Sequence, residues 1–213
     1  MDYTSRMAAL LGRFRRERNG VVADTMQYRG KAYGLNYGVS LPTIRAVARA
    51  ERPDSDFARF LYRQDVRELK LATFWIADPV QVTSVEFSDW GEGIANSEIG
   101  RRVRLRADVP VAARRRVGRA WCDTGNELLG YAGLLALSRI PHPDFSSLVP
   151  VLRRLVVTYP ESNLVAQGVV ALLAAIMTNP AVQRRDIEIF LSSLGPGKTA
   201  RYIEEEMTWR LEY

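Results

Sequence analysis

The sequence predicts an all-α protein built from stacked antiparallel helix pairs, and three observations lead to this fold class. From residue 55 onward, apolar residues recur at the three- and four-residue spacing of helices that bury one face. The expected helix starts recur about every 30 residues, a repeat length typical of helical solenoids. They lie near Asp65, Glu98, Glu127 and Ser162. Prolines separate the periodic segments, where each can end one helix or begin the next: Pro79, Pro110, Pro141, Pro160 and Pro180.

The segment from residue 33 to residue 41 departs from helical periodicity. Its apolar residues alternate strictly with small or polar ones, which is the period of a strand. No other strand is predicted for it to pair with, and Gly34 and Gly38 weaken it, so we expect an extended loop. This loop should lead into a helix that Ser40 and Pro42 begin.

Two later segments are the clearest helices. Residues 145–156 follow the i, i+3, i+4, i+7 rule, which predicts a helix with one buried face. Residues 162–177 are apolar or small nearly all round, which predicts a central helix that lies between neighbours.

Composition limits the classes of protein and site that are possible. A chain of 213 residues with 47% hydrophobic content can bury a substantial core, and we expect one domain spanning residues 1–213. Cys122 and His142 are the only cysteine and histidine, which excludes an internal disulfide and a Cys/His zinc site but leaves an all-carboxylate magnesium site open. We expect no metal and no cofactor. With neither a signal peptide nor a membrane-spanning apolar run, the expected location is cytoplasmic.

An arginine cluster between residues 101 and 119 is the strongest functional signal. Eight arginines stand there against a single acidic residue, Asp108. Such a block of like charge repels itself unless a counter-charged partner neutralises it, which favours DNA or RNA as the partner. Guanidinium groups also match phosphate oxygens in two-point contacts. A solvated face without a partner is the alternative.

Residues 98–107 and 112–121 are predicted to form one antiparallel helix pair within this cluster. Arginines three or four residues apart share one face of a helix, so the pair should present a basic ridge. The predicted DNA contacts in the cluster are Arg101, Arg104, Arg115, Arg116 and Arg119.

A few other residues have competing interpretations. Trp90 lies in a polar, glycine-containing stretch, which makes a base contact and a structural role equally plausible. Asn96 and Glu98 are expected to cap the start of a helix. Arg67 and Glu68 are interpreted as a buried packing pair, and Trp75 is assigned to the core.

Three motifs, in the same order and spacing, resemble those of AlkD-type DNA alkylation repair proteins. Residues 37–48 (YGVSLPTIRAVA) resemble the family's first conserved helix, and residues 61–68 (LYRQDVRE) resemble the helix start that follows it. Residues 161–180, from ESN to TNP, are similar to a late helix of the family. The resemblance covers residues 37–194 and implies a HEAT-like helical repeat solenoid whose concave basic face grips duplex DNA.

The family's enzymes excise N3- or N7-alkylated purines, with an aspartate four residues after a tryptophan and a second tryptophan near an arginine. A carboxylate stabilises the positive charge that develops on the deoxyribose. Here Ile94 stands four residues after Trp90, and Val170 and Leu173 occupy the places of the second tryptophan and its arginine. A shift of register would offer Asp89 or Glu92 as the carboxylate.

The resemblance and the departures together predict a divergent member of this superfamily. We expect it to bind duplex DNA, including alkylated or otherwise damaged DNA, through the phosphate backbone, with weak or absent alkylpurine glycosylase activity. The alternative is a helical-repeat scaffold for protein or RNA partners, because helical solenoids also bind such partners on their concave face.

Overall fold

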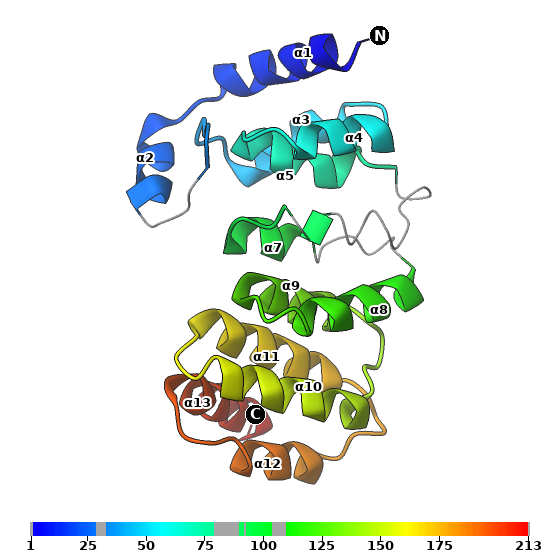
Figure 1. The fold of residues 1–213 in the computed structure, drawn as a ribbon, viewed down its shortest axis with the longest axis vertical. Helices are drawn as coiled ribbons and strands as arrows, with labels where there is room; N and C mark the ends of the chain where they lie inside the picture. The colour runs from blue at the N-terminus through cyan, green and yellow to red at the C-terminus, as the bar shows by residue number, and fades with distance from the viewer. Residues whose placement is uncertain (1, 29–32, 79–89, 92, 104–109, 213) are drawn as a thin grey trace. The chain divides into compact units, whose positions relative to one another are not determined.

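The computed structural model describes residues 2–28, 33–78, 90–91, 93–103 and 110–212, which contain twelve α-helices and no β-strand (Figure 1). The predicted all-α class is therefore confirmed. The chain divides into two compact units, residues 1–102 and residues 103–213. The single domain spanning residues 1–213 stays a prediction. None of the helices in the described ranges is both long enough and apolar enough to cross a bilayer.

The first unit is built around α5, a helix that is buried along nearly its whole length. Its helices are α1 (Tyr3–Arg16), α2 (Gly20–Tyr28), α3 (Leu41–Arg49), α4 (Ser55–Tyr62), α5 (Arg67–Ile76) and α7 (Ser97–Val103), which ends at the boundary between the units. α5 packs against α3 and α4, and α1 packs against the same two helices and buries Leu10 and Phe14. In contrast to its neighbours, α2 has no buried residue.

The segment from residue 33 to residue 40 is an extended loop, as predicted. Its only ladder contact among the described residues is one isolated bridge: the Leu35 amide donates to the Asp65 carbonyl and the Arg67 amide donates to the Leu35 carbonyl, both at 2.9 Å. Ser40 then caps α3, because its hydroxyl accepts a hydrogen bond from the Thr43 amide at 3.3 Å, and Pro42 lies in the first turn.

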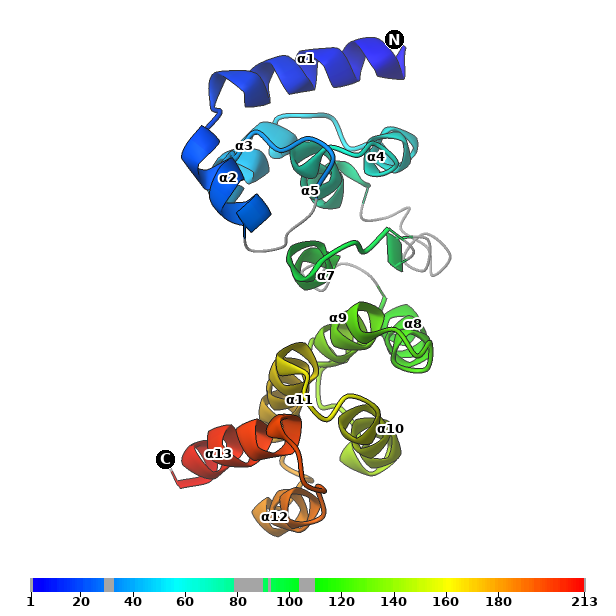
Figure 2. The same ribbon diagram turned by 60° about the vertical axis from the view of Figure 1, so that its left-hand side comes forward.

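The second unit consists of three helix pairs arranged in two layers (Figure 2). The first pair is α8 (Val111–Cys122) with α9 (Glu127–Leu137), the second α10 (Phe145–Thr158) with α11 (Asn163–Ile176), and the third α12 (Arg184–Ser192) with α13 (Lys198–Glu212). α9, α11 and α13 pack in series as one layer, and α8, α10 and α12 form the other. α11 contacts both α9 and α13, which confirms the predicted central helix.

α8 has its most extensive contacts with α9. The predicted pair of residues 98–107 with 112–121 includes residues 104–107, which lie outside the described residues, so that pair stays a prediction. Glycine allows the close approach of α8 and α9, since a Cβ on Gly133 would lie 2.5 Å from the Gly118 carbonyl oxygen and 2.8 Å from the Cys122 sulfur. Helix pairing therefore begins at α8 in the second unit.

Candidate nucleic-acid interface

The arginines of α8 point in different directions and have different partners. Arg114 is buried and donates from Nη1 to the Arg139 carbonyl oxygen at 2.8 Å, which ties α8 to the connection between α9 and α10. Arg115 and Arg116 are exposed. Arg119 is half-buried, and its Nη2 donates to the Ser147 carbonyl oxygen at 3.0 Å. Arg115 and Arg116 are therefore reachable from solvent, Arg119 is partly held by Ser147, and Arg114 is structural.

A small pocket of about 260 Å³ lies beside Arg115 and Arg119. It is also lined by Asp144, Ser147 and residues of the connection that follows α9. Hydrogen bonds from Ser146 and Ser147 lower the pKa of the Asp144 carboxyl below its ordinary value, so that this group is ionised at neutral pH. The pocket thus has two guanidinium groups and one carboxylate around it, a net positive site.

The two layers of the second unit carry opposite excess charge. α8, α10 and α12 contain eight arginines and two acidic residues, Asp186 and Glu188. α9, α11 and α13 contain three basic residues and five glutamates, and α11 has no charged residue at all. A polyanion is therefore attracted to the layer of α8, α10 and α12 and repelled by α13.

Two of the predicted arginine contacts are not on this layer. Arg101 is exposed on α7 and belongs to the first unit. Arg104 lies outside the described residues. Contact of either residue with DNA stays a prediction.

Trp90 belongs to the core of the first unit. Its indole is 2% exposed and meets the Phe74 ring edge-on, with centroids 5.5 Å apart. The Tyr62 hydroxyl donates to the Trp90 carbonyl oxygen at 2.5 Å, and Gly93 leaves room for the Tyr62 ring, because a Cβ there would lie 2.3 Å from it. Trp90 thus has a structural role in this core, and a contact of Trp90 with DNA stays a prediction.

Arg67 is the centre of a buried ionic network. It is 1% exposed and donates from Nε and Nη2 to the two oxygens of Glu98 at 3.0 and 2.8 Å. Its Nη1 donates to Glu68 at 3.0 Å and to the Val39 carbonyl oxygen at 2.9 Å. Burial alone lowers the pKa of Arg67, but Glu98 and Glu68 raise it more, so that it lies above its ordinary value. The predicted Arg67–Glu68 packing pair is confirmed.

The same network anchors the start of α7. The Asn96 side-chain oxygen accepts hydrogen bonds from the amides of Glu98 and Ile99 at 3.0 and 3.2 Å, which confirms the predicted cap. The Tyr33 hydroxyl donates to Glu98 at 2.6 Å. Burial raises the pKa of Tyr33 above its ordinary value, and the hydrogen bond to Glu98 raises it further.

The positions where the family resemblance places catalytic groups hold buried apolar side chains. These are Ile94, Val170 and Leu173. Asp89 and Glu92, the carboxylates that a register shift would offer, lie outside the described residues. Glu98 is the described carboxylate nearest in sequence to Trp90, and its oxygens are occupied by Arg67 and Tyr33. Among the described residues, no three His, Cys, Asp or Glu side chains form a group able to hold a metal ion.

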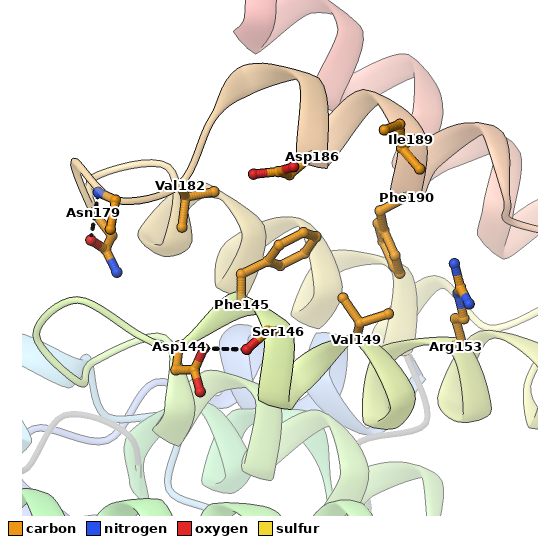
Figure 3. Close-up of a pocket in the computed structure, with 11 residues that line it drawn as sticks. Asp144, Phe145, Ser146, Val149, Arg153, Asn179, Val182, Asp186, Ile189 and Phe190 are labelled. Carbon is orange, nitrogen blue, oxygen red and sulfur yellow. Dashed lines mark hydrogen bonds between the residues drawn. The ribbon is translucent and has the colours of Figure 1, made fainter.

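Sequence reasoning missed a pocket between α10 and α12 in the second unit. Its volume is about 480 Å³, and the rings of Phe145 and Phe190, which line it, meet edge to face (Figure 3). Arg153 lies at one end, and Asp144 and Asn179 lie at the other. Residues 145–156 were predicted to bury one face, but the segment containing Phe190 carries no signal that it meets that face.

One solved structure has the same fold. It is described as belonging to "a new family of proteins related to the HEAT-like repeat DNA glycosylases with affinity for branched DNA structures". The match has a TM-score of 0.72 at 15% sequence identity and covers 99% of this chain and 95% of that one. This similarity confirms the predicted HEAT-like repeat fold. No protein-family model and no curated protein matches the sequence.

Proposed function

We propose that this protein is a divergent member of the DNA alkylation repair superfamily that binds duplex DNA through its phosphate backbone. The observation that carries the proposal is the charge difference between the two layers of the second unit. α8, α10 and α12 contain eight arginines, of which Arg114 is buried, and only two acidic residues. The helices of the opposite layer contain more acidic than basic residues. DNA affinity is dominated by such contacts to phosphate groups.

The fold adds support that charge alone does not provide. The structural neighbour is related to DNA glycosylases and is described as having affinity for branched DNA. Branched DNA consists of duplex arms that meet at a junction, so a backbone-binding surface suits both kinds of substrate. The Arg115 and Arg119 pocket is where we place one phosphate group of the backbone.

A comparison of two double variants tests this function. Arg115→Gln with Arg116→Gln removes two exposed cations from α8, and Lys198→Gln with Arg201→Gln removes two exposed cations from α13. Both variants change the net charge equally. Binding to a fluorescein-labelled duplex and to a four-way junction is measured by anisotropy. We expect about tenfold weaker binding for the α8 variant and a change below about twofold for the α13 variant. Equal losses would reject the α8 surface.

We also propose that alkylpurine glycosylase activity is weak or absent. The proposal rests on the apolar residues at the expected catalytic positions, Ile94, Val170 and Leu173. It also rests on Glu98, whose carboxylate oxygens accept hydrogen bonds from Arg67 and Tyr33. The test is release of N7-methylguanine from a methylated duplex. We expect release at the background rate. Rapid release that Asp89→Asn or Glu92→Gln abolishes would show that the segment outside the described residues supplies the catalytic acid.

A further inference from the structure

We propose that the pocket between α10 and α12 binds an unpaired nucleobase of a DNA strand whose backbone lies on the basic layer. This inference rests on the proposed DNA binding and adds a base-binding site to it. A pocket of about 480 Å³ has room for a base with part of its sugar. The Phe145 and Phe190 rings pack edge to face, at 84° with centroids 5.9 Å apart. Because Phe190 is buried, the half-buried Phe145 is the aromatic side chain that a flat ligand can contact.

The polar groups of the pocket match the edge of a base. Asp144 and Asp186 contribute carboxylates, and Asn179 contributes an amide. Amino and imino N–H groups of bases donate to carboxylates, and an asparagine amide can both donate and accept. The hydrogen bond from Ser146 that lowers the pKa of Asp144 keeps that group an acceptor at neutral pH. Hydrogen bonds from the Ser146 hydroxyl and from the amides of Gln183 and Ala181 hold these three side chains in place.

Guanidinium groups lie on both sides of the pocket, where the phosphates on either side of a bound base would be. Asp144 lines both this pocket and the smaller one that contains Arg115 and Arg119, so the two sites are adjacent. Arg153 is exposed at the other end of the larger pocket. A strand that enters the pocket with its base therefore meets guanidinium groups on both sides, and these groups favour its phosphates.

The ligand must be an unpaired base because a base stacked inside a duplex cannot enter a side pocket. Ile189 is 55% exposed at the pocket, an apolar side chain that a base would cover on binding. Stacking on an aromatic ring stabilises the binding of an unpaired base, and Phe145 supplies such a ring in this pocket. A protein therefore gains affinity wherever the DNA offers an unpaired base next to a duplex arm.

The test compares a fully paired duplex with the same duplex carrying one bulged 2-aminopurine. The variant is Ile189→Asp, which puts a charge on the pocket wall at a solvent-exposed position and so leaves the fold intact. The matched control is Val157→Asp on α10, where the side chain is 74% exposed and does not line the pocket. Each change adds one negative charge to the same layer, so the general electrostatic loss is equal.

For the wild type we expect about tenfold tighter binding to the bulged duplex than to the paired one, with a change in 2-aminopurine fluorescence on binding. Ile189→Asp should remove this preference and the fluorescence change, and Val157→Asp should keep both. If the wild type binds paired duplex in a salt-dependent manner but shows no preference for the bulge, the base-binding proposal is overturned and the DNA-binding proposal stands. A preference that Ile189→Asp leaves intact would also overturn the proposal, because it would show that the unpaired base binds outside this pocket. If the wild type binds neither DNA, both proposals fail together.

Discussion

The two compact units use arginine in opposite ways. In the first unit, Arg67 is 1% exposed and shares its N–H groups with the carboxylates of Glu98 and Glu68. In the second unit, Arg115 and Arg116 are exposed, and no acidic side chain among the described residues forms a salt bridge with either. The number of arginines is therefore a poor guide to function. What separates a structural arginine from a candidate contact is whether its guanidinium is buried against acceptors of the protein itself, as in Arg67 and Arg114.

Replacing the buried Arg67 with an uncharged residue should lower the free energy of unfolding more than any other change proposed below. Arg67→Met leaves the carboxylates of Glu98 and Glu68 buried without their counter-charge, which costs about 3–5 kcal/mol. Urea unfolding followed by circular dichroism should show the first unit unfolding at a much lower urea concentration. Arg63→Met, at the exposed end of α4, is the matched control, with an expected change below about 0.5 kcal/mol. Similar losses for both variants would refute the assigned role of Arg67.

Tyr33, which donates to Glu98 in the same network, should have a smaller effect on stability, and this effect should depend on pH. Tyr33→Phe removes the hydroxyl that donates to Glu98 and should cost about 1 kcal/mol at pH 8. The folded-state pKa of Tyr33 is raised, so its contribution is fully present below the unfolded pKa of about 10 and is lost as the pH rises above that value. The stability difference between wild type and Tyr33→Phe should therefore shrink above pH 10. A difference that grows there would contradict the sign of the pKa shift.

The smallest effect on stability is expected on α8. The double variant Arg115→Gln with Arg116→Gln removes no described salt bridge, so its free energy of unfolding should stay within about 0.5 kcal/mol of the wild type. A slight gain is the favoured direction because self-repulsion in the arginine cluster falls. A loss above 2 kcal/mol would show that these side chains are structural.

Local features of the fold could be predicted from sequence because they depend on neighbouring residues. Ser40 and Asn96 cap helices as expected, and Ser162 accepts from the Val165 amide at 3.0 Å. Features that depend on distant residues could not. Trp90 is buried because Phe74 and Tyr62 reach it from other helices, and no local pattern shows this. Trp75, by contrast, is less buried than predicted: it was assigned to the core but is only half-buried.

The candidate site shows the same limit. The arginine cluster is visible in the sequence, but the layer to which α8 belongs follows from its pairing with α9. That pairing depends on the close approach of Gly118 and Gly133, which lie on separate helices. The α10–α12 pocket likewise joins Phe145 to Phe190, residues that only the folded chain brings together.

The salt dependence of DNA binding tests the central claim most directly. If the exposed arginines of α8 neutralise phosphate groups, the logarithm of the wild-type binding constant falls linearly with the logarithm of salt concentration, and replacing Arg115 and Arg116 by Gln makes that slope shallower by about 2. The Lys198→Gln and Arg201→Gln variant should keep the wild-type slope. An unchanged slope for the α8 variant would contradict the claim that this layer contacts DNA.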